Sequence, residues 1–398
     1  NFGIRFARAR RIAGLPLLYD APPELAAAPS PAVAAFYLGY LLLAAGLFCV
    51  AVSGVATVLK PRFDHRITSW PVVSFAAVGW AGLLIVSSIA AVNAFLPAAR
   101  WALGLSPMPS EYSVGWHVLF HNMHYLPLMA TVIVWYVLVQ AVAGVKSVFG
   151  SHLSKIAFSI YLIFVPPTSL YNMFLEPNLS EAVRVIGSLL SLFISVPTVM
   201  VFLVIVASLE VHARAHGATG LFGWIRMLPW RNPAMAAMGM AVVNLALGGA
   251  FSFVLIQEKL APLLSDTFFV PGYFHFLTVG TVTLTFLGAF CYILPGLTGR
   301  GLWKPRVLAG LPYLVTAGLL IFGASGIAAG YLGVPRRVLD VSYGSAAPAL
   351  WTLLMAGIGI GGVIMAAGLF IYLFGLFRTL WPAPAGTAAV EPLPVVDW

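Results

Sequence analysis

Apolar residues in this chain run in long segments, and polar residues gather in the short stretches between them. A helix needs about 20 mostly apolar residues to cross a hydrocarbon core about 30 Å thick. Nine segments approach or exceed this length, so the pattern predicts nine transmembrane helices. They lie near residues 33–58, 70–97, 114–143, 153–174, 183–211, 233–256, 268–295, 306–332 and 347–379.

The composition excludes a soluble fold. Of the 398 residues, 61% are hydrophobic and only 8% are charged, whereas a soluble domain carries about 25% charged residues. Such a chain must be solvated by membrane lipid, and its net charge of +9 indicates basic cytoplasmic loops rather than nucleic-acid binding. We therefore predict an all-α integral membrane protein with an extramembrane arm at 1–32, a helical bundle at 33–380 and a tail at 381–398.

The distribution of Lys and Arg predicts the orientation. The alternate loops at 59–68, 144–152, 212–232 and 296–305 are basic, and basic loops remain on the cytoplasmic side of a membrane. The N-terminus is then periplasmic and the C-terminus cytoplasmic. The pair Arg336–Arg337 breaks this rule, because it lies in an outer loop. From charge alone, its anionic partner could be lipid, a protein carboxylate or a cofactor.

Four histidines lie within the apolar segments, where ionisable groups are costly and usually functional. His117, His121 and His124 are spaced by four and three residues, so they share one face of the third predicted helix. His275 lies at the start of the seventh. Such a histidine either hydrogen-bonds to a neighbour or binds a metal or haem iron. The spacing of these residues leaves both interpretations open.

Several longer blocks resemble one known family. GLFGWIRMLPWRNPAM (220–235), VPGYFHFLTVGTVTLTFLGAFCYILPGLTGR (270–300) and GVPRRVLD (333–340) are similar to subunit I of the haem–copper oxidases, in the B-type branch. The similarity runs in order through almost the whole chain. The resemblance implies an all-helical bundle of the twelve-helix type, with the nine predicted spans corresponding to its fourth to twelfth helices.

The resemblance also assigns roles to individual residues. The family reads V-P-G-H-F-H where this chain reads VPGYFH. The first histidine of that motif binds the high-spin haem, and Tyr273 stands in its place. The second binds the low-spin haem, and His275 retains it. The family's V-P-R-R sequence binds haem propionates, a role that falls to Arg336 and Arg337.

The copper site of the family is largely replaced. HNMHY aligns with the family's H-P-x-x-Y motif, so His121 and Tyr125 are retained while Asn122 replaces the proline. The family's adjacent histidine pair is expected at Tyr171–Asn172. Imidazole suits copper well, whereas phenol and amide are poor substitutes, so we expect neither copper nor a high-spin haem. A different metal site that uses His117 and His124 beside His121 stays an alternative.

The family's first three helices have no counterpart in this sequence, and the second of them normally supplies the other ligand of the low-spin haem. We expect that ligand to come from another membrane subunit or from an upstream part of this chain, which begins with Asn rather than Met. The expected partners are membrane lipid and another membrane subunit. A quinone or a periplasmic redox protein is a further expected partner, whereas nucleic acid is not.

These observations predict a membrane-bound electron-transfer subunit of a respiratory or redox complex, carrying a low-spin haem b, in a prokaryotic cytoplasmic membrane. One alternative is a structural subunit without a cofactor. Another is a terminal oxidase or nitric oxide reductase rebuilt around Tyr273, His121 and His124. A third is a proton or solute pathway that uses Tyr125 and Tyr136. Carbon monoxide binding to a haem would separate the catalytic alternative from the electron-transfer prediction.

Overall fold

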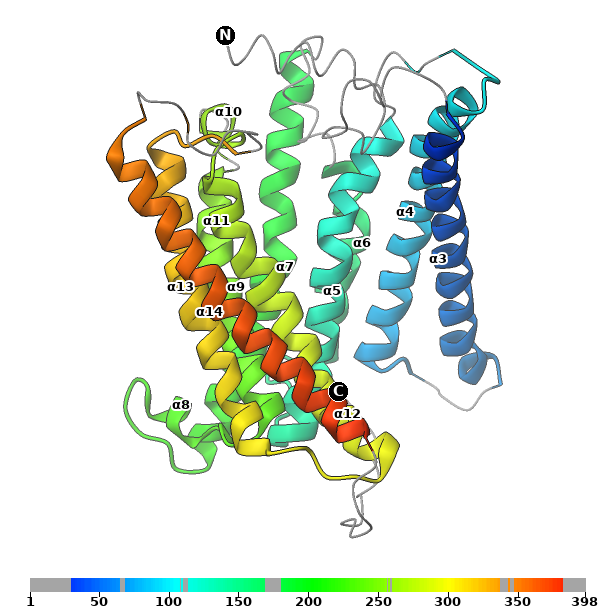
Figure 1. Cartoon of the computed structure of the whole chain (residues 1–398). Helices are drawn as coiled ribbons and strands as arrows, with labels where there is room; N and C mark the ends of the chain where they lie inside the picture. The colour runs from blue at the N-terminus through cyan, green and yellow to red at the C-terminus, as the bar shows by residue number, and fades with distance from the viewer. Residues whose placement is uncertain are drawn as a thin grey trace. The chain divides into compact units, whose positions relative to one another are not determined.

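The computed structural model describes residues 30–64, 69–107, 109, 114–168, 180–255, 257, 260–336, 343 and 347–381. All regular structure among these residues is helical, apart from one isolated antiparallel bridge between Thr267 and Pro335. The helices (Figure 1) are α3 (Pro31–Phe63), α4 (Val72–Ala102), α5 (Val114–Ala143), α6 (Gly150–Phe164), α7 (Glu181–Ala215), α8 (Gly223–Met227), α9 (Pro233–Leu255), α10 (Ala261–Leu264), α11 (Phe269–His275), the π-helix η2 (Phe276–Thr283), α12 (Leu284–Thr298), α13 (Pro305–Tyr331) and α14 (Ala349–Leu380).

Eight helical stretches in the described part of the chain are long and apolar enough to cross a membrane. One of them is the continuous helix formed by α11, η2 and α12. In lipid a helix is favoured because it satisfies its own backbone hydrogen bonds. The eight stretches confirm eight of the predicted spans, with ends that differ by a few residues.

The remaining predicted span, 153–174, corresponds to α6, which is 15 residues long and ends at Phe164. Pro166 and Pro167 follow directly. Proline lacks a backbone donor and disfavours helical geometry in the residue before it, which explains why α6 stops there. Residues 169–174 lie outside the described residues.

The chain divides into two compact units. The N-terminal unit comprises residues 1–129 and 155–197, and the C-terminal unit comprises 130–154 and 198–398. The chain passes from one unit to the other within α5, α6 and α7.

In the N-terminal unit, α3 packs along α4 through small and aromatic residues. The rings of Tyr40 and Phe95 stack with centroids 5.0 Å apart. The indole nitrogen of Trp80 on α4 donates to the carbonyl oxygen of Leu126 on α5 at 2.8 Å. Aromatic stacking and interhelical hydrogen bonds such as this one therefore hold α3, α4 and the first half of α5 together.

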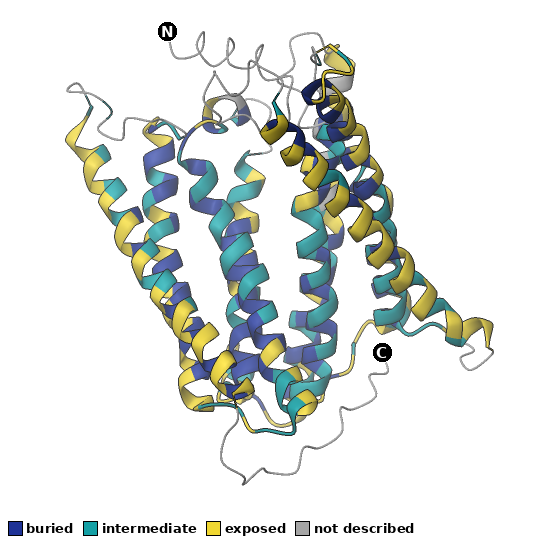
Figure 2. Cartoon of the chain, turned by 45° about the vertical axis from the view of Figure 1, so that its right-hand side comes forward, coloured by how far each residue is buried: buried dark blue, intermediate teal, exposed yellow. Residues whose placement is uncertain are grey.

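In the C-terminal unit, α13 and α14 run side by side (Figure 1) and touch through their backbones. A Cβ atom added to Gly318 would lie 2.7 Å from the backbone nitrogen of Met365. Without a hydrophobic effect between helices in lipid, contacts of this kind through small residues supply the packing energy. In Figure 2 the long helices carry buried residues along one side and exposed residues along the other.

Candidate functional site

His275 ends α11, on the helix that continues through η2 and α12. Its ring nitrogen Nδ1 lies 2.7 Å from the carbonyl oxygen of Pro271, one turn earlier. Because a carbonyl oxygen only accepts hydrogen bonds, the proton of the neutral imidazole lies on Nδ1. Nε2 therefore carries the lone pair. A hydrogen bond from the other ring nitrogen to a carbonyl is a usual support for a metal-ligating histidine.

The imidazole of His275 also packs against α13. The centroid of the Phe322 ring lies 4.4 Å from that of the imidazole, with the planes inclined by 43°. The His275 side chain is half-buried. One side of the ring is thus occupied by a phenyl group, and the hydrogen bond to Pro271 restricts its rotation.

Glycines allow α11 and α13 to approach each other next to His275. A Cβ atom on Gly272 would lie 2.6 Å from the backbone nitrogen of Ile327, and one on Gly326 would lie 2.8 Å from the Cα of Gly272. Contacts this close exclude any side chain at these two positions. The backbone that carries His275 is therefore held against the backbone of α13.

The helix changes its winding directly after His275. Residues Phe276–Thr283 form the π-helix η2, and the α-helix resumes at Leu284. Turns of π-helix are rare and occur frequently at functional sites. Two hydroxyl groups reinforce the wider winding, because Thr281 donates to the carbonyl oxygen of Phe276 and Thr283 to that of Thr278, each at 3.0 Å.

The loop that carries the arginine pair is tied to the start of α11. The backbone nitrogen of Arg336 donates to the carbonyl oxygen of Asp266 at 3.1 Å, and that of Phe268 donates to Val334 at 3.0 Å. Arg336 is half-buried and lies at the end of the C-terminal unit where α11 begins. Arg337 lies outside the described residues.

Tyr273 is buried two residues before His275, with 8% of its surface exposed. Its ring centroid lies 5.8 Å from that of Phe269 and 6.2 Å from that of Phe274. The guanidinium of Arg336 is close enough for its positive charge to act on the phenol. Tyr273 and Arg336 therefore share one electrostatic environment.

The three histidines of α5 belong to the N-terminal unit. His117 and His121 are each 7% exposed, and His124 is half-buried. The ring centroid of His121 lies 4.9 Å from that of Tyr125, and the centroids of His124 and Phe120 are also 4.9 Å apart. The imidazoles of His121 and His124 therefore pack against aromatic rings of their own helix.

No group of three or more His, Cys, Asp or Glu side chains that could hold a metal occurs in the part of the chain that the structure describes. Tyr171 and Asn172, at the expected position of the family's histidine pair, lie outside it.

Asn122 is fully buried and links α5 to α4. Its Nδ2 donates to Ser87 Oγ at 3.0 Å, and Ser87 Oγ donates to the carbonyl oxygen of Leu83 at 2.7 Å. The residue that stands where the family has proline thus contributes an interhelical hydrogen bond.

Sequence analysis missed two residues that contact the region of His275. Phe322 is one of 27 phenylalanines, and nothing in its pattern distinguishes it from the others. Asn244 on α9 is fully buried and donates to Thr316 Oγ1 on α13 at 3.0 Å. A polar side chain in the middle of an apolar segment is a signal of function, so Asn244 could have been found.

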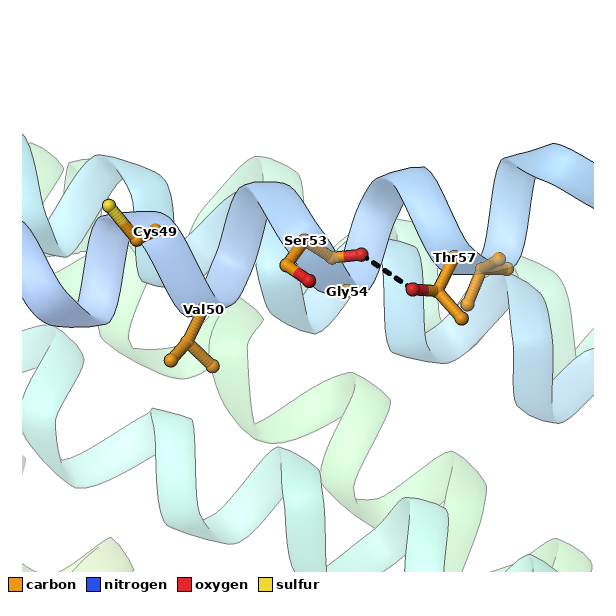
Figure 3. Close-up of a pocket in the computed structure, with 6 residues that line it drawn as sticks. Cys49, Val50, Ser53, Gly54 and Thr57 are labelled. Atoms are coloured by element: carbon orange, nitrogen blue, oxygen red, sulfur yellow. Dashed lines mark hydrogen bonds between the residues drawn. The ribbon is translucent and has the colours of Figure 1, made fainter.

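An open recess of about 590 Å³ lies along α3 (Figure 3). All six lining residues come from this one helix: Cys49, Val50, Ser53, Gly54, Thr57 and Val58. The hydroxyl of Thr57 donates to the carbonyl oxygen of Ser53 at 2.8 Å. The recess is a shallow surface that a lipid chain or another helix could cover.

The fold and this site define an all-helical, multi-pass membrane protein in which one imidazole, that of His275, is held by a backbone carbonyl. Residues 14–393 match the family described as "Cytochrome C and Quinol oxidase polypeptide I". The chain belongs to this family, a family of membrane electron transport, and the resemblance seen in the sequence is confirmed.

Individual relatives agree. The chain is 30% identical over 403 residues to "Cytochrome c oxidase subunit 1" of Thermus thermophilus, which covers 97% of this chain and 70% of the relative. A shorter stretch of 126 residues is 28% identical to "Cytochrome c oxidase polypeptide 1" of Halobacterium salinarum, covering 30% of this chain and 21% of that one.

A solved structure shares the fold. A chain of a haem–copper terminal oxidase dimer, determined by cryo-electron microscopy, superposes on this chain with a TM-score of 0.79. The superposition covers 92% of this chain and 66% of the oxidase chain. The sequence identity is 21%, so this likeness concerns the fold alone. It confirms the predicted twelve-helix type of bundle, of which this chain spans about two thirds.

Proposed function

We propose that this chain is a membrane-bound electron-transfer subunit of a respiratory or redox complex, and that it binds a low-spin b-type haem through His275. The observation that carries the proposal is the hydrogen bond from His275 Nδ1 to the Pro271 carbonyl oxygen, at 2.7 Å. It leaves Nε2 free of the proton and orients the ring. A bound haem would supply one-electron redox chemistry.

The basic groups near α11 fit the carboxylates of such a haem. Arg336 is half-buried beside α11, and its backbone nitrogen donates a hydrogen bond to the carbonyl oxygen of Asp266. Arginine binds carboxylates through charge-assisted hydrogen bonds. We assign Arg336 and Arg337 to the propionates, which accounts for two positive charges in a loop predicted to be periplasmic. The proposed orientation has a periplasmic N-terminus and a cytoplasmic C-terminus, in a prokaryotic cytoplasmic membrane.

The replaced residues argue against oxygen or nitric oxide chemistry. Tyr273 occupies the position of the family's high-spin haem ligand, and Tyr171–Asn172 the position of its copper-binding histidine pair. With only His121 retained, the expected copper site lacks two imidazoles. We therefore propose that one haem is present and that His275 binds its iron on one side.

The second axial ligand and the redox partners would come from other molecules. The Thermus relative and others like it are named as subunits, and this chain spans 70% of that relative. We propose a membrane subunit that supplies the equivalent of the first three helices and the second haem ligand. Helix α3 offers this subunit a contact surface, because only 11% of its most apolar stretch of 18 residues is buried. A quinone or a periplasmic redox protein would exchange electrons with the complex.

A second candidate function rests on Tyr273. Its phenol is buried, which opposes a phenolate, and lies within the field of the Arg336 cation, which offsets part of that cost. Tyrosinate is a known haem ligand. In this alternative the chain is a terminal oxidase or reductase in which Tyr273 binds a second, ligand-accepting haem.

The test is a reduced-minus-oxidised optical spectrum of the chain purified with its partners, repeated after addition of carbon monoxide. The proposal expects a low-spin b-type signal that carbon monoxide leaves unchanged and that His275→Ala abolishes. His117→Ala, which removes another buried membrane imidazole, is the matched control and should keep the signal. A carbon monoxide shift lost in Tyr273→Phe would establish the second candidate. Absence of any haem from the wild type would leave a structural subunit.

A further inference from the structure

The π-helix η2 connects His275 to α12, and a buried polar side chain from another helix lies against its centre. That side chain is Asn244 of α9, which is fully buried. A Cβ atom placed on Gly280 would lie 2.5 Å from Asn244 Cγ and 2.9 Å from its Oδ1. Asn244 therefore touches the backbone of η2 at the one residue of that segment that has no side chain.

The neighbouring residues of α9 follow the same segment. The carbonyl oxygen of Ala241 accepts a hydrogen bond from Thr281 Oγ1 at 3.4 Å. A Cβ atom on Gly248 would lie 2.7 Å from Leu277 Cδ2. Residues 241, 244 and 248 share one face of a helix. This face of α9 thus contacts η2 along its length, with Asn244 in the middle.

Asn244 also joins this contact to α13. Its Nδ2 donates to the carbonyl oxygen of Met240 at 2.8 Å and to Thr316 Oγ1 at 3.0 Å. Thr316 and Gly323 are two turns apart on one face of α13, and the edge of the Phe276 ring lies against Gly323. The next residue towards Thr316 is Phe322, which packs on the imidazole of His275.

The amide of Asn244 is a costly choice for packing alone. Its Oδ1 is buried and accepts no hydrogen bond from any residue that the structure describes. Polar groups inside a membrane are expensive and are usually retained for function. Leucine would fill a similar volume without that cost, but it could not donate to Thr316.

We infer that Asn244 is a positioning residue for His275. It holds η2 in place at Gly280 and α13 in place at Thr316. The π-helix η2 continues the backbone of His275, and α13 packs against its ring. The inference rests on the proposed haem ligation, because the property that Asn244 sets is the strength of the bond between His275 Nε2 and the haem iron. A loosely held imidazole donates less to ferric iron, so the midpoint potential of the haem should rise when Asn244 is replaced.

The test is a redox titration of the purified complex, followed through the low-spin haem band. Asn244→Leu should raise the midpoint potential by about 59 mV. For a one-electron couple, this shift corresponds to about a tenfold change in the ratio between the imidazole affinities of the ferric and the ferrous haem. Thr316→Val, a smaller change in case Asn244→Leu does not assemble, should shift it in the same direction. Thr316→Ser keeps the hydroxyl and should retain the wild-type potential.

Thr379→Val is the matched control. Thr379 is also a buried threonine of the C-terminal unit, and its Oγ1 bonds to the backbone of Gly375 and Trp303. It should leave the potential unchanged even if it lowers the unfolding temperature. If the wild type contains haem and both Asn244→Leu and Thr316→Val keep its potential, the positioning role is wrong and haem binding stands. If the wild type contains no haem, the proposed function fails, and the positioning role fails with it.

Discussion

His275 and His121 are both imidazoles on membrane helices, yet their surroundings differ. His275 has Nδ1 bonded to the Pro271 carbonyl and Phe322 against its ring. His121 is more deeply buried, with 7% of its surface exposed. Its ring contacts that of Tyr125 on the same helix, with the ring centroids 4.9 Å apart. The residue after it, Asn122, bonds to Ser87 on α4. The family gives both positions a metal-binding role.

The difference teaches that a histidine at a ligand position has to be judged by the contacts around its ring. A ligating imidazole needs a partner on its second nitrogen and neighbours that fix its ring. In the C-terminal unit, these supports are the Pro271 carbonyl and the Phe322 ring beside His275, and in the N-terminal unit Asn122, next to His121, joins α5 to α4. Four predictions test this contrast.

The largest effect is expected from removing the two imidazoles in turn. His275→Ala should abolish the haem band, because the proposed axial ligand is lost, whereas His121→Ala should leave the band at its wild-type position and intensity. Optical spectra normalised to protein content measure both. Equal losses of haem in the two variants would show that the α5 histidine also supports a haem.

A large effect on stability is expected where α11 meets α13. Gly272→Ala forces a Cβ atom to within 2.6 Å of the Ile327 nitrogen, and overpacking of this kind costs about 1–3 kcal/mol. Gly46→Ala on α3 is the matched control, because nothing lies within 4 Å of its added Cβ. Denaturant unfolding in detergent compares their free energies of unfolding. A Gly272→Ala protein as stable as the Gly46→Ala control would contradict the close contact.

An intermediate effect is expected from the charge of Arg336. A unit charge near a redox centre contributes about 1–2 kcal/mol at an intermediate dielectric constant, or roughly 40–90 mV for a one-electron couple. Arg336→Gln removes a positive charge that stabilises the reduced haem, so the midpoint potential should fall. Arg336→Lys keeps the charge and should fall less. A potential that is the same in all three proteins would remove Arg336 from the haem environment.

The smallest effect is expected from the hydrogen bond between α4 and α5. Ser87→Ala deprives the buried Asn122 Nδ2 of its acceptor, and interhelical hydrogen bonds in membranes contribute about 0.6 kcal/mol on average. The free energy of unfolding should fall by about that amount, while the haem spectrum stays the same. Ser88→Ala, whose hydroxyl bonds only within α4 at Leu84 in the described structure, is the control. A changed haem spectrum in Ser87→Ala alone would connect this unit to the redox site.

The hydrophobic pattern predicted most of the fold, because a lipid environment leaves helices as almost the sole option for a spanning chain. The span predicted at 114–143 coincides with α5, whereas the span predicted at 153–174 ran past the end of α6 at Phe164. Pro127 and Pro197 lie inside helices while Pro166–Pro167 follow the end of one. Hydropathy alone does not separate these cases, because neighbouring helices decide which prolines are tolerated.

The candidate site was predictable in its ligands but not in its supports. His275 could be singled out because imidazole is costly at membrane depth, and Arg336 because it breaks the charge rule. The contact of Phe322 with His275 depends on how closely α11 approaches α13, which glycines at 272 and 326 permit. The hydropathy of 276–283 does not distinguish a π-helix from an α-helix, although the hydroxyls of Thr281 and Thr283 within the segment support the wider winding.

The eight residues of η2 also have a meaning as a length. A π-turn holds about one residue more than an α-turn, and each residue of an α-helix turns the chain by about 100°. If this segment rewound to an ordinary α-helix without losing a residue, everything before it would rotate by about 100° relative to α12 for each extra residue that the π-turns hold. His275 would then point towards a different neighbour. The winding of these eight residues therefore sets the direction of the imidazole, even where the sequence around it stays the same.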